Sequence, residues 1–116
     1  MADPMLSNRT IRTYADFWPY YLQEHAKPAT RALHYVGTSV ATLSLLGLIL
    51  TGNPWFVPGA LAGGYGFAWF AHFFIEKNKP ATFTYPAWSL VSDFRMAWLW
   101  VTGSLGPELD RAGVTR

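Results

Sequence analysis

Three histidines and one glutamate are the residues whose types and spacing point most directly to chemistry. The histidines are His25, His34 and His72, and Glu76 follows His72 at the spacing of neighbours on one helix face. Three imidazoles with a nearby carboxylate suit Fe(II) or Zn(II), with open positions left for substrate or O₂. Asp93 is a further candidate, either as a ligand or as an acceptor for an imidazole N–H. The chain has no cysteine, which excludes thiolate ligands and disulfides.

Each of these residues also has a purely structural interpretation. His34 could bond a carbonyl of an opposing helix, and His25 could sit at an interface on an aromatic face. Asp93 could pair with a nearby cation, and Glu76 could be solvated or paired with Lys77, Lys79 or Arg31. Three histidines are too few for a membrane di-iron enzyme, so the count favours a mononuclear site.

Two long apolar runs must position these residues. No Asp, Glu, Lys or Arg occurs between Arg31 and Glu76. The runs, about residues 32–50 and 55–76, are each near the ~20 residues that cross a bilayer as a helix. Only 14% of the chain is charged, against about 25% in average usage. The sequence therefore predicts an all-α membrane protein whose core is a two-span antiparallel transmembrane hairpin.

The short connection of residues 51–54 makes the two spans antiparallel neighbours. Such a hairpin brings the start of one span beside the end of the next, so the three histidines are expected in one layer. The second span carries Gly59 and Gly63 in the spacing that permits close helix contact, and Gly37 is one of the small residues of the first span.

Amphipathic helices are expected to flank the hairpin at the membrane interface, at about 13–26 and 85–103. Thr13 and Asp16 have capping-box spacing, and Pro19 would kink the first helix or mark its true start. Lys27 is biased away from helix because Pro28 follows it. A polar, mobile tail is expected over 106–116. The whole chain, 1–116, is interpreted as one domain.

The orientation of the hairpin in the membrane is predicted from its positively charged residues. They precede the first span and follow the second but are missing from the connecting loop. They are Arg9, Arg12, Lys27, Arg31, Lys77 and Lys79. This distribution predicts both termini in the cytoplasm, in a bacterial inner membrane. The polar N-terminus does not read as a cleaved signal peptide. The net charge of +2 is explained by residues that flank spans, so no nucleic-acid partner is expected.

The sequence resembles the Mpo1-like family, in particular its short bacterial branch. The resemblance is carried by the pattern F-x-x-Y-x₄-H-x-x-P-x₅-H-x-x-G-T, which begins at Phe17, and by GFAWFAHFFIEKNKPAT over 66–82. Tyr85, Pro86, Trp88 and Asp93 also fit that branch.

The resemblance implies an Fe(II)-dependent dioxygenase that shortens 2-hydroxy fatty acids by one carbon, with O₂ as co-substrate and no 2-oxoglutarate. His25, His34 and His72 would hold the metal, with Glu76 as ligand or orienting group. Asp93 would serve as a ligand or as an acceptor for an imidazole N–H. Arg31, Lys77 or Lys79 would attract the headgroup of the acid. The alternatives are a zinc-dependent lipid hydrolase and a non-catalytic membrane hairpin that binds lipid or a protein partner. A homo-oligomer is possible in each case.

Overall fold

The computed structural model describes residues 11–115, and every regular element in that range is a helix. Contacts within the chain group it into two compact units. The hairpin unit is Lys27–Asn78, and the terminal unit combines Met1–Ala26 with Lys79–Arg116. Arg9 and most of the polar N-terminal segment lie outside the described residues.

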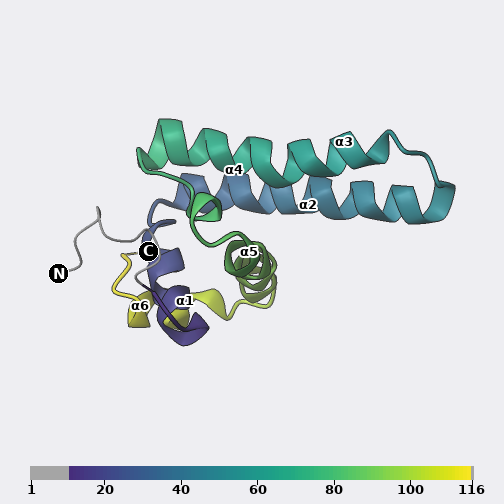
Figure 1. The fold of residues 1–116 in the computed structure, drawn as a ribbon. Helices are drawn as coiled ribbons and strands as arrows, with labels where there is room; N and C mark the ends of the chain where they lie inside the picture. Colours follow the sequence, from purple (N-terminus) through teal and green to yellow (C-terminus); the bar gives the residue numbers. More distant parts are fainter. Residues whose placement is uncertain (1–10, 116) are drawn as a thin grey trace. The chain divides into compact units, whose positions relative to one another are not determined.

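The hairpin unit consists of one long helix packed along a second helical segment (Figure 1). The long helix, α2, is Pro28–Thr51. The second segment runs without a break through α3 (Phe56–Leu61), η1 (Ala62–Gly66), α4 (Phe67–Phe70) and η2 (Ala71–Glu76). Both η elements are π-helical, so this segment has two wider turns that the sequence pattern did not predict.

Local signals explain the ends of α2. Lys27 is extended before Pro28, as the pre-proline restriction predicts, and Pro28 occupies the first turn, where its missing N–H is not needed. Gly52 ends the helix in the left-handed conformation, with φ of 69°. The turn that follows is held by Asn53, whose side chain accepts a hydrogen bond from the backbone N–H of Trp55.

Glycines let the two segments of the hairpin approach closely. A Cβ added at Gly37 would lie 2.4 Å from the carbonyl oxygen of Gly63, and one added at Gly63 would lie 2.7 Å from a methyl group of Val40. Neither position has room for a side chain. The small-residue contact predicted between the two apolar runs is therefore present.

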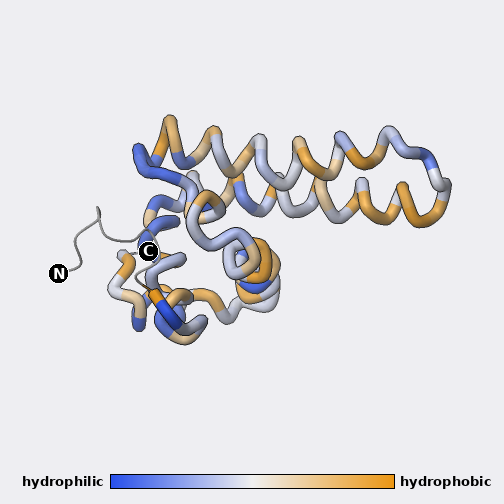
Figure 2. The backbone as a smooth tube through the Cα atoms, viewed as in Figure 1, coloured by the Kyte–Doolittle hydropathy of each residue, from blue (hydrophilic) through white to orange (hydrophobic). Residues whose placement is uncertain are grey.

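Apolar side chains cover the outside of the hairpin unit. In Figure 2 its hydrophilic residues gather at the connecting loop and at the open end. Among the described residues one helix, α2, is long and apolar enough to cross a membrane, with a mean hydropathy of 1.6 over its most apolar stretch, of which 17% is buried. The second segment is apolar, but none of its four successive helical elements is long enough by itself to count as such a helix, so the predicted second span is not confirmed.

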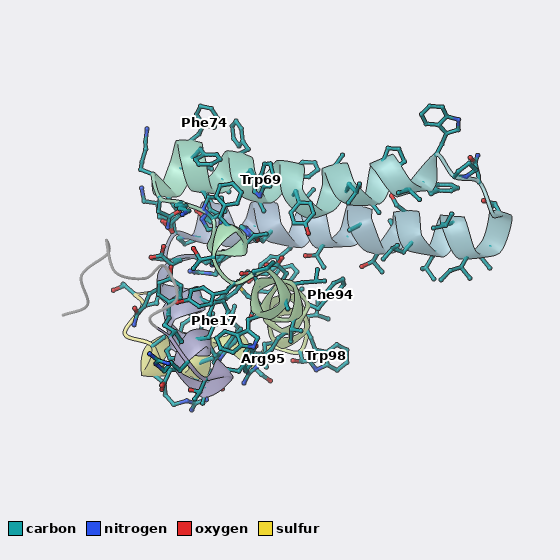
Figure 3. All side chains as sticks on the ribbon, viewed as in Figure 1. Phe17, Trp69, Phe74, Phe94, Arg95 and Trp98 are labelled. Carbon is teal, nitrogen blue, oxygen red and sulfur yellow. The ribbon has the colours of Figure 1, made fainter. Side chains whose placement is uncertain are left out.

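The terminal unit packs three helices, α1 (Tyr14–Gln23), α5 (Pro86–Val101) and α6 (Leu105–Arg111), with the short 3-10 turn η3 (Ala81–Phe83) preceding α5. Thr13 caps α1 through the backbone N–H of Asp16 at 3.2 Å, as its spacing predicted. Pro19 lies inside α1 and does not mark its start. Phe17 is fully buried among these helices, while Trp98 of α5 is exposed (Figure 3).

The end of the chain is not the polar, mobile tail that we expected. Leu105 and Leu109 of α6 are buried, as are Ala112 and Val114 beyond it. The indole N–H of Trp18 also donates to Glu108 at 2.8 Å. Burial of these four apolar residues, which recur at near-helical spacing, orders the segment although polar residues lie between them.

Candidate metal centre

Two of the three histidines meet inside the hairpin unit. His34 lies in the second turn of α2 and His72 lies in η2, at the same end of the antiparallel pair. Their ring centroids are 5.1 Å apart with the rings nearly perpendicular, and both side chains are buried. The hairpin thus brings these two residues together as the topology predicted.

Hydrogen bonds orient both rings of this pair. His34 Nδ1 donates to the carbonyl of Thr30 on its own helix at 3.0 Å, and His72 Nδ1 donates to the amide oxygen of Asn78 at 2.7 Å. A carbonyl oxygen can only accept, so Nδ1 carries the proton and Nε2 carries the lone pair in each neutral ring. The carbonyl that His34 bonds through Nδ1 therefore belongs to its own helix.

His25 shows the same pattern within the terminal unit. It lies two residues beyond the end of α1, which is shorter than the predicted 13–26, and it is buried. Its Nδ1 donates to the carbonyl of Tyr21 at 2.6 Å, and the Tyr21 ring stacks on the imidazole with 4.1 Å between centroids. Nε2 again carries the lone pair.

The donor set therefore fits a metal ion. The three buried histidines each offer one ring nitrogen as a ligand. Metal-bound histidines commonly donate their other ring N–H to a carbonyl or carboxylate, which fixes the tautomer and the ring orientation. All three histidines of this chain make such a bond.

Glu76 closes the open end of the hairpin. Its Oε1 accepts the backbone N–H of Lys27 at 2.7 Å, while Lys27 Nζ donates to the carbonyl of Ile75 at 2.9 Å. The carboxylate therefore ties the start of α2 to the end of η2, next to the histidine pair. The sequence analysis used Lys27 as a charge that sets topology and as the residue before Pro28, and it did not predict this contact.

Asp93 does not receive an imidazole N–H directly in the terminal unit. It is half-buried on α5 and accepts a short hydrogen bond from the hydroxyl of Tyr21, the residue whose carbonyl and ring hold His25. Burial raises the pKa of Asp93 from 3.8 to about 7, and the Tyr21 hydrogen bond opposes that rise. Tyr21 therefore contacts both Asp93 and His25.

The three cationic candidates differ in exposure. Arg31 is buried on α2, one turn before Tyr35, whereas Lys77 and Lys79 are exposed. Lys77 ends η2 in the left-handed conformation, with φ of 62°. Lys79 belongs to the terminal unit.

Sequence reasoning did not identify three residues that the site uses. Asn78 and Tyr21 supply the acceptors for His72 and His25. Thr30 is fully buried, and its hydroxyl has no hydrogen-bond partner among the described residues. That hydroxyl lies one helical turn before His34 on α2. Only Asn78 had a signal, because it lies in the run over 66–82 that carries the family resemblance.

An all-helical chain with three buried, oriented histidines defines a class of candidate metalloprotein. A family model described as 2-hydroxy-palmitic acid dioxygenase Mpo1-like matches residues 11–105, and the chain belongs to this Mpo1-like family. No curated protein and no solved structure matches the chain.

Proposed function

We propose that the chain is an Fe(II)-dependent dioxygenase that removes one carbon from 2-hydroxy fatty acids. The observation that carries the proposal is the common orientation of the three imidazoles, each with Nδ1 held by an acceptor and Nε2 bearing the lone pair. The description of the family supports the substrate class. Imidazole ligands that leave positions open are typical of non-haem iron sites for O₂ chemistry.

His25 completes the set in this proposal, and the covalent chain supports that role. His25 precedes Lys27 by two residues, which limits their Cα separation to about 7.6 Å. Lys27 in turn is bonded to Glu76, one helical turn beyond His72. Connectivity alone therefore keeps the His25 backbone near the open end of the hairpin.

The reaction balances without a further reductant. A 2-hydroxy acid and one O₂ yield the acid shortened by one carbon, CO₂ and water, with four electrons passing from the C1 and C2 carbons to O₂. Iron would supply the one-electron chemistry that O₂ requires. The chain's own residues bind and orient the acid: the Thr30 hydroxyl bonds one of its oxygens, and Arg31, with Lys77 or Lys79, attracts its carboxylate.

The hairpin spans the membrane twice in this proposal, with both chain ends in the cytoplasm. The low burial of α2 supports it, because the core helix of a soluble protein would be mostly buried. The second segment also exposes large apolar side chains, and a soluble monomer rarely exposes so many together. They include Leu61, Trp69, Phe70, Phe73 and Phe74.

Metal content and O₂ uptake test the proposal together. Anaerobically purified protein should contain about one iron per chain and consume O₂ with 2-hydroxypalmitate, releasing CO₂. His72→Ala should lose both, whereas Ser39→Ala, an exposed position on α2, should keep both. Bound zinc with oxygen-independent lipid hydrolysis would identify a hydrolase instead. Metal-free protein with full activity in His72→Ala would overturn the metal site.

A further inference from the structure

His25 differs from the other two histidines because it lies in a turn and not in a helix. His34 is inside α2 and His72 is inside η2, so regular helical backbone fixes where each of these side chains begins. His25 follows the end of α1, and its backbone N–H donates to the carbonyl of Leu22 at 3.1 Å. Its side chain is nevertheless buried. A buried ring on a turn needs contacts from other residues to define its orientation.

Tyr21 supplies two such contacts within the terminal unit. Its carbonyl accepts the Nδ1 proton of His25, and its ring stacks on the imidazole with 4.1 Å between centroids and 28° between planes. Both contacts come from one residue, about one turn before His25. Rotation of the Tyr21 ring would remove the surface against which the imidazole lies, so the orientation of His25 depends on what holds Tyr21.

Helix α5 holds the Tyr21 ring from the other side. The carboxyl group of Asp93 accepts a hydrogen bond from the phenol hydroxyl, and Tyr21 is only 1% exposed, so water competes little for this bond. Trp18 stacks on Tyr21 with 5.8 Å between centroids and 11° between planes. The guanidinium of Arg95, also on α5, lies 4.1 Å from the centre of the Trp18 ring. Two residues of α5 therefore contact the stack of rings that ends at His25.

We propose that Tyr21 and Asp93 are positioning residues for His25, and that their hydrogen bond keeps Nε2 of His25 oriented to bind the metal. This inference rests on the proposed function, which makes His25 a ligand. Partners that orient a metal-bound histidine typically change metal affinity about 10–100-fold. Tyr21 is such a partner by contact, and Asp93 acts on the ligand through it.

Fe(II) affinity of the full chain tests the pair, measured without oxygen by competition with a chromophoric chelator. Tyr21→Phe keeps the carbonyl and the ring but removes the hydroxyl, and affinity should fall about tenfold or more. Asp93→Ala should cause a similar fall, whereas Asp93→Asn keeps an acceptor for Tyr21 and should bind near the wild-type affinity. Tyr21→Phe combined with Asp93→Ala should bind no more weakly than either alone, because both changes remove one bond.

Tyr14 offers a matched control on the same two helices. Its hydroxyl forms a hydrogen bond with that of Ser92 at 2.9 Å, so Tyr14→Phe also removes one bond between α1 and α5. Fe(II) affinity should be unchanged in this variant. An equal loss in Tyr14→Phe would show that only the packing of α1 on α5 matters, and wild-type affinity in Tyr21→Phe would also overturn the proposal. If Tyr21→Phe does not fold, Asp93→Ala against Asp93→Asn makes the same comparison.

A measurement on metal-free protein separates this inference from the proposed activity. Nitrogen-15 NMR of labelled histidine shows which ring nitrogen carries the proton. His25 of the wild type should carry it on Nδ1, and Tyr21→Phe should give a mixture of both tautomers, whereas Tyr14→Phe should not.

Each outcome bears on one claim. This NMR result in a protein that binds no iron would retain the positioning pair and refute the metalloenzyme. Iron binding that depends on the pair, without O₂ uptake, would retain it and refute the dioxygenase. His25 signals that do not change in Tyr21→Phe would refute the positioning role.

Discussion

The backbone N–H of Lys27 and the carboxylate of Glu76 are joined at 2.7 Å across the open end of the hairpin. This bond lies next to the histidine pair and distinguishes two roles for Glu76. A ligand must present a carboxylate oxygen to the metal, whereas an orienting group needs only an acceptor for Lys27.

Substitution of Glu76 separates the two roles. Glu76→Gln keeps a carbonyl acceptor for the Lys27 N–H, so iron content should remain near that of the wild type if the residue only orients the hairpin. Glu76→Ala should cost about 1 kcal/mol of stability or more and loosen the site. Elemental analysis and thermal unfolding measure both effects. Equal metal loss in the two variants would make Glu76 a ligand.

Asn78 is expected to control metal affinity through His72. Asn78→Ala removes the acceptor that orients the imidazole, and the loss of such a partner typically lowers metal affinity about 10–100-fold. Asn78→Asp retains an acceptor and should bind metal near the wild-type affinity. Competition with a metal chelator gives both constants. If Asn78→Ala bound metal as tightly as the wild type, the hydrogen bond would have no orienting role.

The close approach of the hairpin segments at Gly37 should make that position intolerant of a side chain. Gly37→Ala places a Cβ 2.4 Å from the Gly63 carbonyl oxygen, which is rigid backbone, so the segments must separate. The expected loss is roughly 1–3 kcal/mol of stability. Gly64→Ala is the control, because its Cβ makes only ordinary contact. Thermal unfolding in detergent compares the two, and equal midpoints would contradict the close packing.

The sequence predicted the elements better than their termini or their irregularities. The stretch without charged residues predicted the two apolar helices. Their antiparallel arrangement was enough to bring His34 beside His72. The π turns of the second segment were not predictable, because hydrophobic periodicity does not distinguish a π turn within an all-apolar run. Helix α6 was missed because Pro107, Glu108 and Asp110 obscured the spacing of Leu105 and Leu109.

The partners of the site were less predictable than its candidate ligands. The metal was suggested by three histidines and one glutamate that the predicted hairpin gathers in one layer. The acceptors are two backbone carbonyls, of Thr30 and Tyr21, and one amide. A backbone carbonyl occurs at every residue, so no pattern of residue types marks these two. Asp93 was identified as a partner for an imidazole, but Tyr21 lies between it and His25.

The membrane topology can be tested with single cysteines because the chain has none of its own. Asn53→Cys lies in the connecting loop and Lys77→Cys at the open end, and both positions are exposed. A membrane-impermeant maleimide added to intact cells should label Asn53→Cys and leave Lys77→Cys unlabelled until the membrane is opened. Labelling of both in intact cells, or of neither, would contradict a hairpin with cytoplasmic ends.

Asp93 should make the stability of the protein depend on pH in a defined direction. Its pKa is raised from 3.8 to about 7 by burial, so the folded protein binds the proton more tightly than the unfolded chain. Stability contributed by the protonated carboxyl is present at low pH and is lost as pH rises from about 4 to 7. Between pH 5 and pH 8 the expected loss is about 2 to 3 kcal/mol.

Asp93→Asn isolates this contribution because an amide oxygen still accepts from Tyr21 but does not ionise. The unfolding temperature of the wild type should fall relative to that of Asp93→Asn as pH rises from 5 to 8, and both proteins keep the same three histidines. Tyr21→Phe removes the hydrogen bond that favours the ionised Asp93, so the pKa of Asp93 should rise further. The loss of stability should then extend to higher pH. Parallel pH profiles for the wild type and Asp93→Asn would show that the carboxyl group does not titrate in this range.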